Sequence, residues 1–410
     1  MSYLVQLIAN RIVASKPSPF KNASFTCKPE PGSASALGYS RSYSISLSPQ
    51  LIYTRSTMLP ALISSKIYRQ LEFLAVGSWW IYDRKDRNSS GQGDNGPGPT
   101  STDSSGRLQK IPGGREDVFG DTSIDLRSTR ALMKFLKLAA DTEVHPAILE
   151  EWGSKPFPEF LTSHVKVPTS LQPSLLALTL SPKPPAQTIT SYALPQIHRH
   201  LTSIGMFGSG FGSVIPRWGG LAEVAQVACR ALAVSGGVYI LKNGIEIIED
   251  FGQLPESKDV PTPDENASPL KIRLEGGEEI QTHWIAGNSY DLPPKYRSPV
   301  DRPSTSISHS ISIVSSPLSF LFPHPSEGSP PPACALVSFP TGSLGSEERP
   351  PVYLMVHSTD TGECPTGQCE SQPSFDGLYS LPHFTFMMIQ QRILIYIVCN
   401  FIEDNIPLTV

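Results

Sequence analysis

The spacing of hydrophobic residues near the start of the sequence predicts one strand and two helices. Apolar and polar residues alternate at the beginning of 43–52, which predicts a short half-buried strand. This strand runs into Ser48-Pro49, a typical helix start, so a helix is expected from about Pro49 to Met58. Residues 59–70 then carry apolar side chains at helical spacing.

A strand rich in aromatic and branched residues is expected at 71–82. Successive side chains of a strand point to opposite faces, so the adjacent Trp79 and Trp80 should face opposite sides of the sheet. Residues 84–107 have no hydrophobic period and are typical of a flexible insertion. Because 108–111 again suits a strand, we expect a hairpin that closes across this insertion.

An α-helical region is expected from about 125 to 203. Asp125 and Ser128 are alternative N-caps for its first helix. One amphipathic face of that helix is predicted to hold Leu132, Met133, Leu136 and Ala140. Helical segments separated by prolines continue to about Ser203, and together they predict a compact helical subdomain.

The best-defined element of the sequence is a helix at 221–234. It is an alanine-rich stretch without a helix breaker, between glycine pairs at 219–220 and 236–237. Glu223, Gln226 and Arg230 form one polar stripe on it, because this spacing places them within roughly 60° of arc. Every other position is apolar, so the helix should be buried around most of its circumference. The stripe is either a solvated face or a protein-recognition surface.

Short strands are expected after this helix. A turn signal at 242–244 lies between two apolar segments, 238–241 and 245–249, and predicts a β-hairpin. Further strands are expected at 272–274, 311–314, 335–339 and 352–357, with loops rich in proline and serine at 255–269 and 292–308.

Composition narrows the class of protein. The chain has 410 residues, 39% of them hydrophobic, which is enough for a sizeable core and suggests two or three domains. The 33 basic and 37 acidic residues are interspersed, which argues against a nucleic-acid partner. Forty prolines and 31 glycines gather in particular stretches, as in ordered blocks separated by disordered insertions. Six scattered cysteines fit reduced cytosolic thiols better than a disulfide framework.

Motifs for catalysis, nucleotide binding or metal binding are weak or missing. Glycines at 205, 208, 210 and 212 suggest a structural turn, because they do not open a helix after a strand as a dinucleotide fingerprint does. His198 and His200 are expected to be surface or capping residues, since no further ligand lies near them. The pair Cys364 and Cys369 does not complete a zinc site either. We therefore expect no catalytic residues, no metal and no cofactor.

The two ends of the sequence allow different interpretations. The first 29 residues lack acidic side chains and resemble a transit peptide, although a chain whose true beginning lies elsewhere explains them better. Residues 378–402 are strongly apolar, but their most continuous part, 393–402, is about half the length of a membrane helix. A buried strand or an aberrant tail is preferred there to a transmembrane anchor.

Several segments taken together resemble Rab escort proteins, fungal members most closely, which are relatives of the Rab GDP dissociation inhibitors. The resemblance runs from about Phe20 to Gln368 and is specific, because long segments occur in the family's order. The segments that carry it are SYSISLSPQLIYTRSTMLPALISSKIYRQLEFLAVGSWWIY at 42–82, IPGGREDVF at 111–119, RALMKFLK at 130–137, LALTLSP at 176–182 and FGSVIPRWGGLAEVAQVACRALAVSGGVYIL at 211–241.

This resemblance implies an α/β (α+β) fold, in which an all-helical domain is inserted into a multisheet flavoprotein-like domain. The expected divisions are an atypical N-terminus at 1–20 without the family's glycine-rich segment, a first part of domain I at 21–124, the inserted domain II at 125–203, a second part of domain I at 204–368 and an atypical tail at 369–410.

The function implied by the resemblance is that of a non-catalytic accessory subunit. Family members bind GDP-bound Rab GTPases, present them to the α/β subunits of geranylgeranyl transferase and carry the prenylated product, with its prenyl lipid, to membranes. Arg69, Glu223, Gln226 and Arg230 match the family's Rab-binding platform. Phe135 matches a helix that docks on the transferase, with a core phenylalanine as the alternative.

Two other functions are weighed against this one. A Rab GDP dissociation inhibitor would only recycle prenylated Rab, and a flavin-dependent oxidoreductase of the parent fold would need a nucleotide fingerprint that the sequence lacks. The expected location is the cytosol, with transient peripheral membrane contact and the nucleus as a further compartment.

Overall fold

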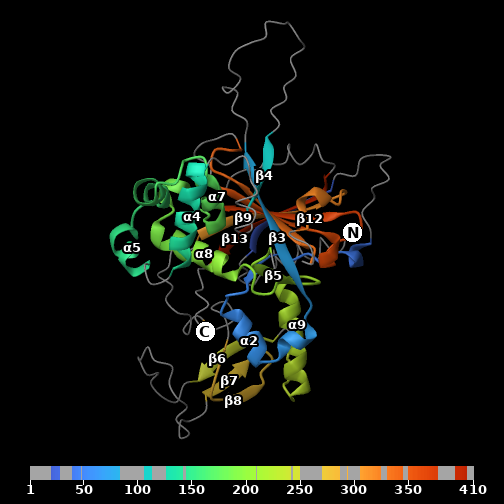
Figure 1. The fold of residues 1–410 in the computed structure, drawn as a ribbon. Helices are drawn as coiled ribbons and strands as arrows, with labels where there is room; N and C mark the ends of the chain where they lie inside the picture. The colour runs from blue at the N-terminus through green and yellow to red at the C-terminus, as the bar shows by residue number, and fades with distance from the viewer. Residues whose placement is uncertain are drawn as a thin grey trace.

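The fold is built on one large mixed sheet with helices beside it (Figure 1). The computed structural model of the chain describes residues 20–27, 39–47, 49–83, 106–112, 126–141, 145–208, 210–241, 243–249, 270–286, 293, 305–324, 330–344, 350–376 and 393–403. The predicted flexible insertion at 84–107 and the loops at 255–269 and 292–308 lie largely outside these residues, as do most of 1–20 and 377–392.

The large sheet has ten strands in the order β1-β13-β9-β12-β11-β10-β3-β5-β2, with β4 paired to β3. Its strands are β1 (Phe20–Cys27), β2 (Ile52–Tyr53), β3 (Phe73–Asp83), β4 (Arg107–Ile111), β5 (Ser213–Pro216), β9 (Thr305–Val314), β10 (Cys334–Phe339), β11 (Val352–His357), β12 (Cys369–Asp376) and β13 (Ile393–Glu403). A second sheet contains β6 (Ile245–Glu249), β7 (Leu270–Leu274) and β8 (Glu279–Thr282). In the large sheet β10 pairs with β3 in parallel, and the other pairings are antiparallel.

The helices between residues 126 and 203 gather on one side of the large sheet (Figure 1). They are α4 (Leu126–Ala140), α5 (His145–Trp152), α6 (Phe157–Phe160), the π-helical turn η3 (Leu161–Val165), α7 (Gln172–Thr179), the 3-10 turn η4 (Pro185–Gln187) and α8 (Thr190–Ser203). Phe135 and Leu194 from this block share one hydrophobic core with Trp79 and Leu336 of the sheet. The helical block is thus anchored to the sheet through β3 and β10.

The two tryptophans of β3 serve different cores, as the alternation of the strand predicted. Trp79 is buried in the core that the sheet shares with the helices. Trp80 packs on the opposite core, with Phe339 and Val356, and its Nε1 donates a hydrogen bond of 3.1 Å to the Leu321 carbonyl. A strand with aromatic side chains on both faces lies in the middle of the fold, which fits its place between β10 and β5.

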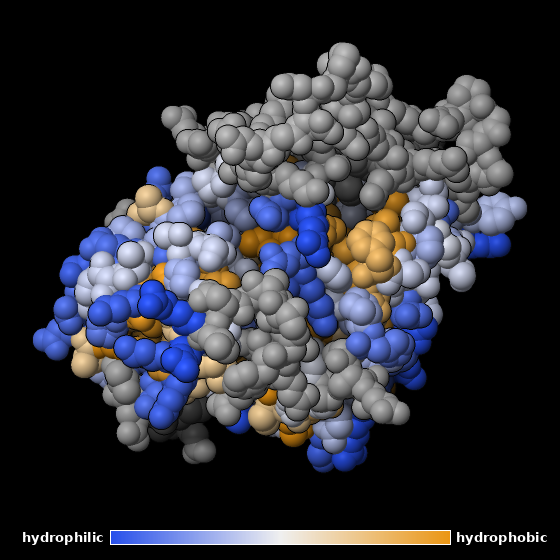
Figure 2. All heavy atoms as spheres, turned by 45° about the horizontal axis from the view of Figure 1, so that its top comes forward, coloured by the Kyte–Doolittle hydropathy of each residue, from blue (hydrophilic) through white to orange (hydrophobic). Residues whose placement is uncertain are grey.

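The helical block turns a polar surface outward. Arg130, Lys134 and Lys137 are exposed on α4, while Leu132 and Phe135 are buried on its other side. Figure 2 shows polar side chains gathered over the left side of the molecule, where Figure 1 places the helices, with hydrophobic side chains reaching the surface nearer the middle. This division is expected for amphipathic helices packed on a sheet.

The predicted α/β fold class is confirmed, because this chain combines a large multistranded sheet with a group of helices that lies between two of its strands in the sequence. The division into domains at 125, 203 and 368 stays a prediction. The hairpin across the insertion is confirmed, because β3 and β4 pair antiparallel from Trp79 opposite Ile111 to Asp83 opposite Arg107.

Predictions for the first hundred residues were partly wrong. Residues 43–47 form no strand, and the first α-helix described is α2 (Met58–Ser64), followed by the 3-10 turn η2 (Ile67–Gln70). The segment before α2 instead supplies the two-residue strand β2, which pairs with β5. A tertiary partner decides its conformation here, and the local pattern does not show that partner.

The buried face of α4 also differs from the prediction. Leu132 is buried as expected, and Met133 and Leu136 pack partly buried against the same core, but Phe135 and Ala139 are buried as well and Ala140 is exposed. These buried positions are spaced at intervals of three and four residues. The helix begins at Leu126, so Asp125 lies outside the described residues.

The hairpin predicted at 238–249 is wrong. Residues 238–241 form no strand, and β6 pairs antiparallel with β7 instead. The partner of β6 therefore comes from more than twenty residues further along the chain. The strands predicted at 272–274, 311–314, 335–339 and 352–357 are confirmed as parts of β7, β9, β10 and β11.

Within the apolar C-terminal segment, residues 393–403 form β13, so the strand interpretation is confirmed for 393–402, while the burial of this strand stays a prediction. β13 lies between β1 and β9 and pairs with both. Residues 369–376, predicted to belong to an atypical tail, form β12 between β9 and β11. Within the described residues, no helix is both long and apolar enough to cross a bilayer.

Candidate protein-recognition site

The candidate site lies where strands β3 and β5 end side by side. Phe73, at the start of β3, is paired with Pro216, at the end of β5. The pairing continues one residue further, because the Arg217 amide donates a 2.9 Å hydrogen bond to the Glu72 carbonyl. Turn η2 enters β3 just before this point and α9 (Leu221–Val234) leaves β5 just after it, so both emerge at the same end of the ladder.

A tight turn with left-handed backbone joins β5 to α9. Trp218, Gly219 and Gly220 have φ angles of 73°, 126° and 63°. Glycine adopts such angles without steric cost, and at Gly219 an added Cβ would also lie 3.0 Å from Ser44 Oγ. The turn lets the chain reverse direction, so that α9 starts beside η2 and packs against it.

The predicted platform residues lie on these two neighbouring elements. Arg69 is exposed on η2, and Gln226 and Arg230 are exposed on α9. Glu223 is half-buried in the first turn of α9, and its Oε1 accepts a 3.1 Å hydrogen bond from Gln226 Nε2. The structure thus brings into contact the two elements that carry these side chains, which are more than 150 residues apart in the sequence.

The surroundings of α9 differ from the prediction. Its bounds are confirmed, but only Val227 is buried, and Leu232 and Val234 are 52% and 82% exposed. Figure 1 shows α9 running away from the end of β5, beyond the large sheet. The helix packs mainly against η2 and β5, and it keeps apolar as well as polar positions at its surface.

A cavity of about 880 Å³ opens beside this site. Leu62 of α2, Phe73 of β3 and Val214 of β5 contribute to its largely apolar wall, and Glu72 and Arg217 stand at its polar side. Sequence reasoning missed this cavity, because its wall is formed by residues from five separate segments. The candidate recognition surface therefore combines charged side chains with an adjoining apolar hollow.

Phe135, the residue predicted to dock on a transferase, is fully buried. Its ring lies 6.1 Å from the ring of Phe157, within the core between helices and sheet. In this conformation Phe135 is a core residue, which was the alternative to a docking role. The docking role of its helix stays a prediction.

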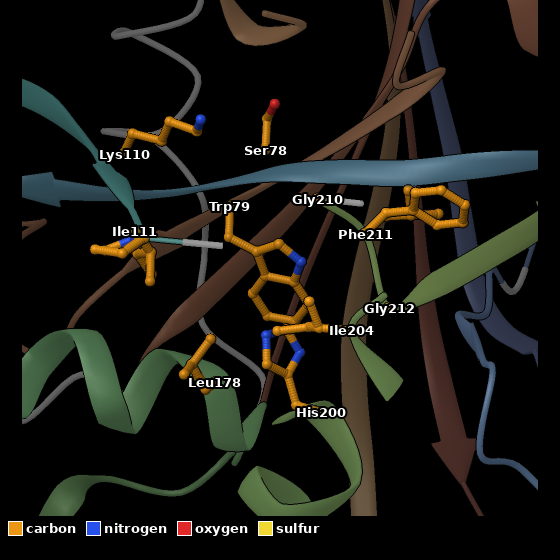
Figure 3. Close-up of a pocket in the computed structure, with 12 residues that line it drawn as sticks. Ser78, Trp79, Lys110, Ile111, Leu178, His200, Ile204, Gly210, Phe211 and Gly212 are labelled. Atoms are coloured by element: carbon orange, nitrogen blue, oxygen red, sulfur yellow. The ribbon is translucent and has the colours of Figure 1, made fainter. Parts of the chain in front are cut away.

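A second, much smaller pocket of about 20 Å³ lies between β3 and the helical block (Figure 3). In Figure 3 Trp79 points from its strand toward His200, with Ile204 alongside, whereas Ser78 points the other way. The ring centroids of Trp79 and His200 are 4.7 Å apart in an edge-on arrangement. A space of this size suits one water molecule, so it offers no substrate site.

The two histidines of α8 have different roles. His198 was expected to be a surface or capping residue, and its Nδ1 lies 2.9 Å from the carbonyl of Ala139, near the end of α4. The same expectation is wrong for His200, which is buried. Burial lowers the pKa of His200 to about 4, so its ring is neutral at physiological pH.

Four buried polar side chains form a cluster at the ends of β11 and β12: His357, Glu363, Glu370 and Gln372. His357 Nδ1 bonds to Glu363 Oε2, and Gln372 Nε2 donates to Glu370 Oε1. Burial and the nearby Glu363 raise the pKa of Glu370 to about 8, against the opposing effect of His357. Burial alone would lower the pKa of His357, but Cys334 and Glu363 outweigh it and raise that pKa well above its usual value.

The glycine-rich segment before β5 and the pair Cys364 and Cys369 were also noted in the sequence. Gly205, Gly208 and Gly210 have positive φ angles in the turn before β5, as the structural interpretation requires. Cys364 and Cys369 are buried free thiols, and burial raises the pKa of Cys369 to about 12. Among the residues that the structure describes, no group of three or more potential ligands could hold a metal ion.

Comparison with known proteins supports the resemblance noted in the sequence. The chain is 25% identical over 341 residues to the "Rab proteins geranylgeranyltransferase component A" of Candida albicans, covering 80% of this chain and 46% of that protein. It is also 25% identical over 333 residues to the protein of the same name from Saccharomyces cerevisiae, covering 80% and 47%. The chain thus spans about half the length of the curated relatives it matches. No family model matches it.

The fold has a counterpart among solved structures. A Rab GDI from Plasmodium falciparum superposes with a TM-score of 0.58 at 15% sequence identity, covering 93% of this chain and 80% of that one. At this identity the likeness concerns the fold alone. The predicted resemblance to Rab escort proteins and the predicted fold class are therefore both confirmed.

Proposed function

We propose that this chain acts as a Rab escort protein, which binds GDP-bound Rab GTPases and presents them to the α/β subunits of geranylgeranyl transferase. The observation that supports the proposal is the contact between η2 and α9 beside the end of the β3–β5 ladder, because Arg69 is exposed on η2 and Gln226 and Arg230 are exposed on α9. The names of its relatives, components of a Rab geranylgeranyltransferase, indicate the partner.

The chemistry of the site suits recognition of a protein. Two guanidinium groups, a carboxylate and an amide stand on elements that are fixed by the sheet, so little ordering is needed when a partner binds. Charged groups at such a surface mainly determine which partner is accepted and how fast it associates. In this proposal the chain binds and orients its partner, and the transferase subunits carry out the chemical step.

After prenylation, the chain is proposed to stay with the modified Rab and its prenyl lipid until delivery to a membrane. It touches that membrane only peripherally, and this role places it in the cytosol for most of the cycle.

The first test measures the affinity of the full chain for an unprenylated, GDP-bound Rab. We expect binding by the unchanged chain and a loss of at least tenfold in a Glu223→Ala/Arg230→Ala variant. Arg273→Ala is a matched control, because Arg273 lies on the separate three-stranded sheet and pairs there with Glu246 at 3.3 Å. Equal binding by the double variant and the control would refute the platform, and no binding by the unchanged chain would refute the function.

A Rab GDP dissociation inhibitor is the second candidate, because the solved Rab GDI of Plasmodium falciparum shares this fold. The two functions differ in the state of the Rab that is bound. An escort protein binds unprenylated Rab and supports its prenylation by purified transferase subunits, whereas a dissociation inhibitor extracts only prenylated Rab from membranes. Prenylation in the presence and absence of this chain separates them.

A further inference from the structure

Arg217 lies at the junction of the two elements that form the platform. Its Nη1 is 2.9 and 3.0 Å from the two carboxylate oxygens of Glu72, the residue immediately before β3. Its backbone amide bonds to the carbonyl of the same residue. One residue pair therefore ties the entry to β3 and the exit from β5 through both backbone and side chains.

The same arginine covers the turn that leads to α9. Its guanidinium carbon is 4.4 Å from the centre of the Trp218 ring, a cation–π contact. The Trp218 amide donates to the Thr361 carbonyl at 2.9 Å, and the Trp218 carbonyl accepts from Ser44 Oγ at 2.9 Å. The turn is thus held on both sides, and Arg217 joins it to Glu72, the residue before β3.

The exposure of this ion pair argues against a large role in overall stability. The side chains of Arg217 and Glu72 are 30% and 55% exposed, and partly exposed pairs contribute little to unfolding free energy. Their position gives them a different effect. The pair lies where η2 enters β3 and α9 leaves β5, between the elements that carry Arg69 and Arg230.

We propose that Arg217 is a positioning residue for the recognition surface: through its ion pair with Glu72 it fixes α9 against η2. The inference rests on the proposed function for its binding readout, but the placement itself is a property of this chain alone. It concerns residues outside the predicted stripe, since neither Arg217 nor Glu72 lies on α9 or η2.

The experiment compares charge reversals of this pair with reversals of a matched pair elsewhere. Arg217→Glu, Glu72→Arg and the exchange variant Arg217→Glu/Glu72→Arg are measured beside Arg273→Glu, which breaks the Arg273–Glu246 pair of similar exposure. Binding to GDP-bound Rab, thermal unfolding and hydrogen exchange are recorded for each variant. The amides of Leu71 and Glu223, bonded to the Tyr68 and Gly220 carbonyls, report on η2 and α9.

We expect each single reversal at 217 or 72 to weaken Rab binding by roughly fivefold, the ratio that corresponds to the upper range of partly exposed pairs. The exchange variant should recover binding to within about twofold, and all melting temperatures should stay close together. Faster hydrogen exchange at the amides of Leu71 and Glu223 in the single variants would support the proposal, provided that it is absent from Arg217→Glu/Glu72→Arg and from Arg273→Glu.

Two results would overturn it. Unchanged binding and unchanged amide exchange in both single variants would show that the pair positions nothing. Loss of binding that the exchange variant fails to recover would show that the two residues act separately. If the unchanged chain binds no Rab, the proposed function fails, and the hydrogen-exchange rates of the two reporter amides alone decide whether Arg217 fixes α9.

Discussion

The buried carboxyl of Glu370 should make the chain less stable as the pH rises. Its pKa is about 8 in the fold and 4.5 as the ordinary value, so the folded state binds more protons than the unfolded state across this interval. The stability it contributes is fully present below pH 4.5 and is lost as the pH rises through about 8. At about 1.4 kcal/mol for each of roughly 3.5 pH units, the total loss is about 5 kcal/mol at most.

The substitution that isolates this effect is Glu370→Gln, which keeps the shape of the side chain and removes its titration. The unfolding free energy of the Glu370→Gln chain should exceed that of the unchanged chain by a small amount near pH 5 and by several kcal/mol near pH 9. His357, whose pKa is also raised, adds a loss of the same sign in the unchanged chain. Because His357 and Glu370 interact, the comparison with Glu370→Gln measures the titration of the two groups together.

The assay is urea unfolding at pH 5 to 9 for both chains. Glu151→Gln, at an exposed position of α5, controls for the loss of one negative charge. Parallel stability profiles for Glu370→Gln and the unchanged chain would refute the reasoning, because they would mean that Glu370 has the same pKa in the folded and unfolded states.

Three further predictions concern the cores on either side of β3. Phe135→Ala should lower the unfolding free energy by about 3 to 5 kcal/mol in urea titrations, since the ring is fully buried; a cost below about 1 kcal/mol would contradict its place in the core. Trp80→Phe should cost about 1 kcal/mol in the same assay through loss of the hydrogen bond to Leu321. His200, with its pKa lowered to about 4, contributes stability that is lost as the pH falls from 6.5 toward 4, so His200→Phe should flatten that acid limb in thermal melts, and an unchanged limb would count against it.

Local signals predicted those elements whose limits are marked in the sequence. Helix α9 begins and ends at the predicted residues because glycines with positive φ flank it. The hairpin across 84–107 was predictable because strand-forming residues reach both edges of a polar stretch. The stripe of Glu223, Gln226 and Arg230 could be predicted from helical spacing alone, but the contact of α9 with η2 depends on the β3–β5 pairing, which no local pattern shows.

Features that depend on distant partners were missed for the same physical reason. The burial of His200 is set by Trp79 and Tyr53, which come from two different strands. The cluster of four buried polar side chains arises because β11 and β12 place His357 opposite Glu370, and nothing near Glu370 in the sequence indicates a buried carboxyl. Residues 238–241 look like a strand, but the sheet position that such a strand needs is taken by β7.

The pairing of β3 with β4 makes the residues between them a practical attachment point. Asp83 and Arg107 are direct partners in the ladder, so the intervening segment leaves and rejoins the fold at neighbouring positions. Doubling the length of such a closed loop costs only about 0.6 kcal/mol in closure entropy. A fluorophore, an affinity tag or a second binding module can therefore be spliced in there, which gives a reporter that leaves both chain ends and the sequence of α9 unchanged.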